Sequence, residues 1–217
     1  MKVILTGATG MIGNLILAQC LESDQINQVV SISRRSSGVE SPKHQEILHE
    51  DFSNLSGLQA YFGNVDCVYF CLGVYTGQVS DVLFKQITYD YVVEFSRVLK
   101  EKSPKASFCL LSGQGADQTE RSNLAFAKYK GMAENHLLTQ CFNSTYLFRP
   151  AYIYPVTKRN EPNIMYKISR VLYPLIKLLG KNASIKSTDL AKAMFLTGIN
   201  GAPKTVLENR DILDLVN

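Results

Sequence analysis

The stretch Lys2–Gly13, KVILTGATGMIG, decides the fold of this chain. Its first residues form a short apolar run, which is typical of a strand buried on both faces. The run leads into three glycines, Gly7, Gly10 and Gly13, spaced as GxxGxxG just before a helix-period segment over Gly13–Leu21. A glycine loop between a buried strand and a helix predicts the opening unit of a nucleotide-binding α/β sheet.

Apolar runs and helix-period segments alternate along the rest of the chain. Further strands are expected over Val29–Ser33, Ile47–His49, Cys67–Leu72, Ser107–Leu111 and Thr145–Phe148, and further helices over Tyr91–Lys100 and Leu124–Gln140. This alternation predicts an α/β fold with a doubly wound parallel sheet of the Rossmann type and helices on both faces. We expect one domain over residues 1–217, with residues 151–217 contributing a small, partly helical cap over the substrate cleft.

Composition excludes several classes of protein. The 217 residues are 46% hydrophobic and 19% charged, which excludes a disordered, collagen-like or coiled-coil chain. The net charge of +4 is too small to indicate nucleic-acid binding. The chain has no apolar run of about 18 residues, so no transmembrane helix is expected. Its five dispersed cysteines and three scattered histidines predict a cytosolic protein with reduced thiols and no metal site.

The glycine loop has a defined chemistry in such a sheet. Gly7 would permit the tight turn, Gly10 would let the backbone approach a pyrophosphate, and Gly13 would let helix and strand pack closely. The helix dipole and free amides at this helix N-terminus would then hold the phosphates. The residues expected to bind the cofactor here are Gly7, Thr9, Gly10, Met11, Ile12 and Gly13. The alternative is a plain strand–helix turn without a ligand.

The end of the second strand indicates which dinucleotide binds. A site for NAD places Asp or Glu there, about 20 residues after the glycine loop, to hold the ribose 2′-hydroxyl. This strand instead runs into Ser33-Arg34-Arg35-Ser36. Guanidinium groups suit a 2′-phosphate by charge and by fork geometry, so Arg34 and Arg35 favour NADP over NAD. The alternative is that both arginines are solvated loop residues.

Several segments carry a resemblance to a known family. TGATGMIG resembles the glycine loop of the extended and atypical branches of the short-chain dehydrogenase/reductase superfamily. Phe148-Arg149-Pro150 and Ser187–Ala191 resemble two later motifs of that superfamily. FCLG, DYV, LLSxxGAD and the Lys130-Gly131 pair are most similar to the Tat-interacting-protein family of atypical reductases.

The resemblance implies further cofactor contacts. Asp51 and Phe52, in HEDFSNL, match the family residues that contact the adenine. Leu72 and Gly73, in CLGVYTG, match the segment that lines the cofactor ribose, and Pro150 ends the matching sixth strand.

The resemblance also implies a Ser-Tyr-Lys triad, and this chain departs from it. Lys130 matches the family lysine, which holds the nicotinamide ribose, but the position four residues earlier is Phe126, which has no hydroxyl. Tyr129 adjoins Lys130 and so points about 100° around the helix from it. The second polar position after the fifth strand, which carries the serine, is Gly113. Ser112 is either a structural hydroxyl or, after a shift of one residue, the catalytic serine.

Three functions fit this degenerate triad. The first is an NADP-binding sensor or regulator, or a weak oxidoreductase. The second is an active NADPH-dependent carbonyl reductase or a sugar-nucleotide epimerase-like enzyme that uses a substitute proton donor. The third is an enzyme whose substrate supplies its own proton. The candidate donors are Tyr75, Tyr152 and Tyr154. An interaction scaffold without cofactor is a further alternative. The sequence names neither the small-molecule substrate nor a protein partner.

The segment Asn163–Lys181 carries an apolar helical stripe opposite a basic face. A cap that packs on the protein's own core is the first interpretation of such a helix. A homodimer or partner surface is the second, and contact with an anionic membrane, which we do not expect, is the third.

Overall fold

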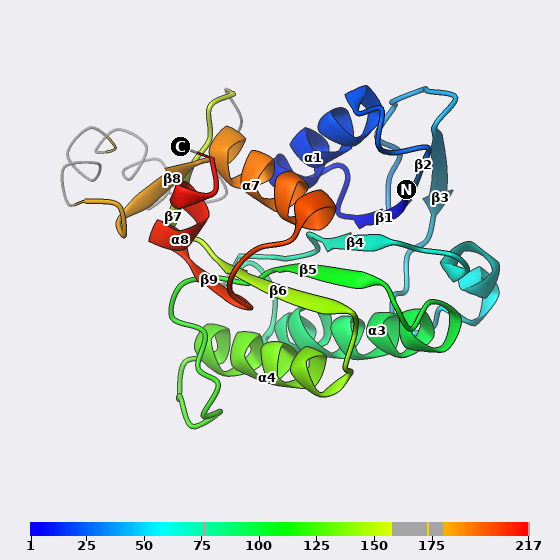
Figure 1. Ribbon diagram of the computed structural model, residues 1–217. Helices are drawn as coiled ribbons and strands as arrows, with labels where there is room; N and C mark the ends of the chain where they lie inside the picture. The colour runs from blue at the N-terminus through cyan, green and yellow to red at the C-terminus, as the bar shows by residue number, and fades with distance from the viewer. Residues whose placement is uncertain (76, 158–172, 174–179, 217) are drawn as a thin grey trace.

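The computed structural model describes residues 1–75, 77–157, 173 and 180–216 (Figure 1). The first elements are β1 (Lys2–Thr6), α1 (Met11–Glu22), β2 (Gln28–Ser33), β3 (His44–Leu48), the 3₁₀ helix η1 (Ser56–Phe62) and β4 (Cys67–Phe70). One continuous helical run follows, consisting of α2 (Asp81–Lys85), the π-helical turn η2 (Gln86–Asp90) and α3 (Tyr91–Lys102). Then come β5 (Ser107–Leu111), α4 (Ala125–Thr139), β6 (Ser144–Arg149), β7 (Tyr152–Tyr154), β8 (Ser184–Lys186), α7 (Ser187–Asn200), β9 (Val206–Glu208) and α8 (Asn209–Asp214).

The main sheet has seven strands in the order β3-β2-β1-β4-β5-β6-β9, and every neighbouring pair is parallel. Helices α1 and α7 cover one face, and α3 and α4 cover the other (Figure 1). The predicted doubly wound Rossmann-type sheet is therefore confirmed. The strand order reverses next to β1, between β1 and β4, which is where sheets of this kind bind ligands.

The core consists of two clusters, one on each face of the sheet. Val3 and Leu5 of β1 belong to the cluster under α1 and α7, while Ile4 between them belongs to the cluster under α3. All three side chains are fully buried. Burial on both faces explains why this strand is apolar at every position instead of at every second one.

The two edge strands, β3 and β9, have the weakest apolar pattern in the sequence of all the strands in this sheet. β3 reads HQEIL and is only partly buried, so its apolar signal is weak, and it begins three residues before the predicted strand. β9 has three residues and was not predicted. It joins the sheet through β6, where Phe148 pairs with Leu207.

Residues 151–217 were predicted to form a cap, but parts of this segment belong to the main domain. β9 extends the main sheet and α7 packs along α1, while β7 and β8 form a separate two-stranded sheet. The predicted helix over 163–181 lies outside the described residues, apart from Tyr173, Gly180 and Lys181. No helix in the described part of the chain has both the length and the apolarity that crossing a membrane requires.

Candidate functional site

The glycine loop brings backbone segments so close together that side chains cannot enter. Gly7 has φ +74°, and a Cβ atom placed on it would lie 2.6 Å from the carbonyl oxygen of Cys71, just after β4. A Cβ atom on Gly13 would overlap the carbonyl oxygen of Gly7. The Gly10 amide donates a hydrogen bond of 2.8 Å to that same oxygen. Gly7 and Gly10 therefore form a compact turn after β1, and Gly13 lets the first turn of α1 pack directly against it.

The turn leaves the start of α1 suited to an anion. The helix is 12 residues long, its first turn contains no acidic residue, and no side chain caps it. Thr9 and Gly10 are exposed, whereas Ile12 and Gly13 are buried beneath them. A helix N-terminus carries a partial positive charge and backbone N–H donors, which together attract phosphate. Ile12 would contribute through its backbone, because its side chain packs in the core.

The other predicted cofactor residues follow the carboxyl ends of the parallel strands and so lie along one edge of the sheet. After β3, Asp51 is exposed, and its carboxylate accepts a hydrogen bond of 2.9 Å from the Ser53 amide. That bond lowers the pKa of Asp51. Phe52 is fully buried, and its ring centroid lies 5.6 Å from that of Tyr91 at the start of α3.

Arg34 lies near this group, although β2 and α3 are far apart in the sequence. Burial raises the pKa of the Tyr91 hydroxyl; the charge of Asp51 raises it further, and Arg34 lowers it. Arg34 and Asp51 therefore both lie close enough to Tyr91 to influence its hydroxyl electrostatically. Arg34 and Arg35 are both exposed, and thus open to a ligand.

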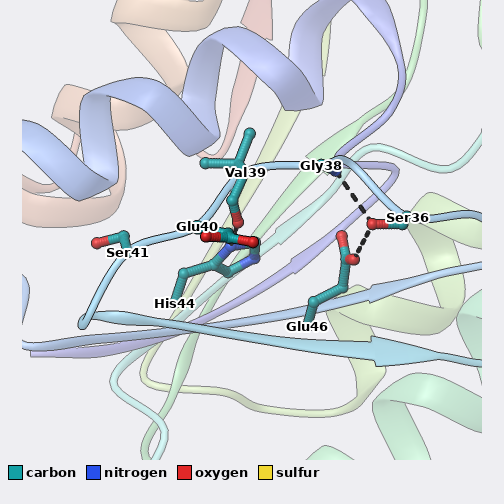
Figure 2. A pocket seen from close by; sticks show the side chains of 7 residues that line it. All are labelled: Ser36, Gly38, Val39, Glu40, Ser41, His44 and Glu46. Atoms are coloured by element: carbon teal, nitrogen blue, oxygen red, sulfur yellow. Dashed lines mark hydrogen bonds between the residues drawn. The ribbon is translucent and has the colours of Figure 1, made fainter.

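A carboxylate from β3 holds the loop that follows the two arginines. Glu46 accepts hydrogen bonds from Ser36 and Ser37. His44 bonds to the carbonyl oxygen of Val39 at 2.8 Å. Figure 2 shows Ser36, Val39, His44 and Glu46 together. A pocket of about 340 Å³ is lined by Ser36, Gly38, Val39, Glu40, Ser41, His44 and Glu46. The sequence pattern gives no signal for Glu46, because the carboxylate expected in such a site follows β2. Strand β3 places this one in register with Ser31 of β2.

Lys130, the predicted triad lysine, belongs to α4. Its Nζ donates a hydrogen bond of 2.9 Å to the carbonyl oxygen of Leu111, the last residue of β5. Burial lowers the pKa of Lys130 from 10.5 to about 8, while Glu134 and Cys71 act in the opposite direction. Lys130 therefore lies beside Cys71, between the carboxyl ends of β4 and β5, next to the predicted ribose segment Leu72-Gly73.

The positions that carry the family tyrosine and serine contact each other. A Cβ atom on Gly113 would lie 2.6 Å from Cζ of Phe126, the ring atom to which a tyrosine hydroxyl would be attached. An aromatic ring and a bare backbone meet here, and neither provides a hydroxyl. Tyr129 instead packs near Phe84 of the α2 helix, with ring centroids 6.4 Å apart.

Ser112 is directed into a buried polar network. It is 6% exposed, and its hydroxyl donates a hydrogen bond of 2.5 Å to the fully buried carboxylate of Glu134. The same carboxylate forms an ion pair with Arg149 of β6 and accepts a bond from Gln118. The Ser112 hydroxyl donates its proton to Glu134. This geometry favours a structural role for Ser112 over a role as the catalytic serine.

Pro150 and the candidate substitute tyrosines lie near the ends of β4 and β6. The Pro150 carbonyl oxygen accepts a bond of 3.0 Å from the Gln114 amide, which joins the ends of β5 and β6. Tyr75 follows β4, and Tyr152 and Tyr154 belong to β7. The ring of Tyr154 stacks on Tyr173 at a centroid distance of 3.8 Å.

The thiols and histidines do not form a reactive centre among the described residues. Burial raises the pKa of the Cys71 thiol to about 12, so it remains protonated near neutral pH. Within the described ranges, no three side chains of His, Cys, Asp or Glu gather as metal ligands would.

Comparison with known proteins identifies the family of this chain. A family model described as NAD dependent epimerase/dehydratase family matches residues 3–130. The chain is 32% identical to Protein fmp52-2, mitochondrial, of Neosartorya fischeri, over 96% of this chain and 93% of the relative. It is 26% identical to Protein HTATIP2 of Rattus norvegicus, over 74% and 66% of the two chains. The Bordetella bronchiseptica enzyme WbmH, solved in complex with NAD⁺, superposes with a TM-score of 0.71 at 16% identity, over 95% of this chain and 74% of the enzyme.

One expectation is overturned by these relatives. The sequence predicted a cytosolic protein, but the fungal relatives from Neosartorya fischeri, Aspergillus oryzae and Debaryomyces hansenii are named as mitochondrial. The cytosolic expectation rested on the dispersed cysteines. Reduced thiols do not distinguish the cytosol from another reducing compartment.

Proposed function

The chain belongs to the NAD dependent epimerase/dehydratase family, and we propose that it binds NADP at the carboxyl edge of its sheet, with little or no hydride transfer. Family membership also confirms the resemblance to the short-chain dehydrogenase/reductase superfamily. The preference for NADP and the loss of catalysis are our own proposals.

The geometry of the glycine turn is the main support for dinucleotide binding. Any side chain on Gly7 or Gly13 would meet backbone atoms of the turn or of the segment after β4. A simple strand–helix connection has no need of so close an approach, whereas a pyrophosphate must reach the backbone amides at the helix start. Lys130, between the ends of β4 and β5, would hold the ribose at the nicotinamide end.

The preference for NADP is supported by charge at the other end of the site. Two exposed arginines follow β2, and Arg34 lies near Asp51 and Tyr91, on the side of the adenine. Glu46 contacts this loop from β3, and its oxygens already accept bonds from Ser36 and Ser37. A ribose 2′-phosphate would therefore meet guanidinium groups.

The proposal of weak or absent turnover rests on Phe126 and Gly113. Reduction of a carbonyl needs a proton donor, because negative charge develops on the oxygen as the hydride arrives. Neither residue can donate, and Ser112 is engaged by Glu134. The loss of a positioned acid typically lowers the rate by about 10²–10⁴.

Calorimetric titration with NADP⁺, NADPH, NAD⁺ and NADH tests this function. We expect the phosphorylated nucleotides to bind about tenfold more tightly, because charged hydrogen bonds to a phosphate contribute about 1.5–3 kcal/mol. Replacing Arg34 and Arg35 by alanine should remove this preference. Replacing Arg97, an exposed arginine on α3 that pairs with Glu94, should leave the preference intact.

Other outcomes would support the alternatives. Equal affinity for NAD⁺ would mean that the arginines are solvated loop residues. The absence of binding by any nucleotide would leave an interaction scaffold. Rapid oxidation of NADPH with a carbonyl substrate, abolished by substitution of Tyr75, Tyr152 or Tyr154, would identify a substitute donor.

A further inference from the structure

The loop between β2 and β3 is attached to β3 immediately after the two arginines. One oxygen of the Glu46 carboxylate accepts a hydrogen bond of 2.5 Å from the Ser36 hydroxyl. The other accepts from the Ser37 amide at 2.7 Å and from the Ser37 hydroxyl at 2.6 Å. Figure 2 shows the Glu46 carboxylate directed at Ser36. The backbone is thus held within two residues of Arg35.

The same loop folds back on itself beyond this attachment. The Ser36 hydroxyl accepts a hydrogen bond of 3.1 Å from the Gly38 amide while it donates to Glu46. Gly38 has φ +69°, which favours glycine, and the turn it makes leads to Val39. The Val39 carbonyl bonds to His44, and the Val39 side chain packs on the core under α1. His44 and Glu46 of β3 therefore anchor successive parts of the loop.

The charge of Glu46 makes its position unexpected in a site for phosphate. Burial raises the pKa of this carboxyl, but hydrogen bonds from Ser36 and Ser37 and the charge of His44 together outweigh burial and lower it. Glu46 therefore carries a negative charge at neutral pH. A negative charge bonded to the residues that follow Arg35 would, by itself, weaken binding of a 2′-phosphate. The Glu46 carboxylate can favour phosphate binding only if holding the loop in place strengthens binding by more than its repulsion of the phosphate weakens it.

We propose that Glu46 is a positioning residue that determines preference for the 2′-phosphate, by holding Ser36 and Ser37 so that Arg34 and Arg35 stay at the adenosine end of the site. This inference rests on the proposed function, since it requires a bound dinucleotide. It assigns to β3 a part of cofactor selection that is ordinarily attributed to the end of β2. Flexible arginines would lose conformational freedom on binding, and an anchored loop reduces that cost.

Positioning and simple electrostatics predict opposite results for Glu46→Gln. The substitution keeps the size of the side chain and removes its charge. If the charge alone mattered, NADP⁺ would bind more tightly. If Glu46 positions the loop, NADP⁺ should bind more weakly, because the glutamine amide group cannot accept all the bonds that Ser36 and Ser37 donate.

Glu40 provides a matched control. It lines the same pocket, is exposed, and takes no part in the bonds that hold Ser36 and Ser37. Glu40→Gln removes the same charge from the same loop without releasing the loop. It should leave the affinity for NADP⁺ unchanged or slightly increased.

The experiment is calorimetric titration of the full chain and both variants with NADP⁺ and NAD⁺, at one ionic strength. We expect Glu46→Gln to weaken NADP⁺ binding about tenfold and NAD⁺ binding less than about twofold. Replacing Ser36 and Ser37 together by alanine removes the hydroxyl donors of the same hydrogen bonds, and should lower NADP⁺ affinity in the same way. Thermal unfolding without nucleotide establishes that each variant is folded.

Three results would overturn the inference. Tighter or unchanged NADP⁺ binding by Glu46→Gln would mean that the loop needs no anchor. An equal loss for NAD⁺ would mean that Glu46 supports the site in general and not its specificity. Equal binding of both nucleotides by the unsubstituted chain would remove the preference that Glu46 is proposed to set, while no binding at all would overturn the proposed function itself.

Discussion

Phe126 and Gly113 occupy adjoining positions at the carboxyl edge of the sheet, and what each position can hold depends on the other. The Phe126 ring fills the space where a serine Cβ atom would lie on Gly113. Restoring the serine alone would therefore press it against the ring. Restoring the tyrosine alone would direct its hydroxyl at a glycine, which offers no side-chain hydrogen bond.

Joint restoration should recover chemistry at this site. We expect the variant with Gly113→Ser and Phe126→Tyr to oxidise NADPH with small carbonyl compounds at least about 10² times faster than the unsubstituted chain. The ring at position 126 must first rotate away from the added serine, which is possible because its Cζ atom is the free end of a side chain and not backbone. The phenol then lies four residues before Lys130, whose charge stabilises the phenolate. The measurement is the steady-state decrease in NADPH absorbance.

A second double variant separates the hydroxyl from the change in packing. Gly113→Ser with Phe126→Leu makes room for the serine but provides no phenol, so its rate should remain at the unsubstituted level. If the unsubstituted chain already turned over as fast as the restored variant, the loss of the triad tyrosine would not limit its activity.

Among the elements, α1 and the turn before it form one unit. The helix packs so closely on the turn that Gly13, inside its first turn, touches the backbone of Gly7. Because neither partner is the flexible end of a side chain, the contact cannot relax by rotamer changes. Glycine is needed here for space, and at Gly7 for both space and backbone conformation.

Gly13→Ala tests this unit. We expect it to lower the free energy of unfolding by about 2–3 kcal/mol and to abolish dinucleotide binding, since α1 must move away from the turn. Urea unfolding and calorimetry measure the two effects. Gly57→Ala is the control, because a Cβ atom there meets nothing within 4 Å. Loss of stability in Gly57→Ala equal to that in Gly13→Ala would contradict the argument from close packing.

At the scale of the whole molecule, the C-terminal part of the chain packs on the same face of the main sheet as α1. Helix α7 packs along α1 and over β4, where the Tyr69 hydroxyl donates a bond of 2.8 Å to the carbonyl oxygen of Phe195. A Cβ atom on Gly198 would overlap this hydroxyl. Tyr69 is fully buried in the sheet and has no room to withdraw.

Gly198→Ala should therefore destabilise the whole molecule by about 2–3 kcal/mol in urea unfolding. Tyr69→Phe alone should cost about 1 kcal/mol for the lost hydrogen bond. Combined, the two substitutions should cost less than their sum, because removing the hydroxyl makes part of the room that the added methyl group needs. Strict additivity would show that the cost of the added methyl group does not come from its overlap with the Tyr69 hydroxyl.

The local sequence pattern was sufficient to predict those features of the structure that depend on residues close together in the chain. The apolar run Lys2–Leu5 and the glycine spacing predicted β1, the turn and α1, because burial on both faces and close backbone approach restrict residue types at each position. Counting four residues back from Lys130 identified Phe126, because helix geometry is regular. The seven-stranded parallel sheet confirms the fold that these patterns implied.

Which distant residues meet was decided only when the chain folded. The Gly113–Phe126 contact, the Ser112–Glu134 bond and the attachment of Glu46 to Ser36 each join different elements, and no local pattern encodes such pairs. The short strands β7, β8 and β9 were missed for the same reason, since three residues carry little periodicity and pair only after the chain has folded back. Local propensity restricts the backbone of each segment, but long-range packing selects its partner.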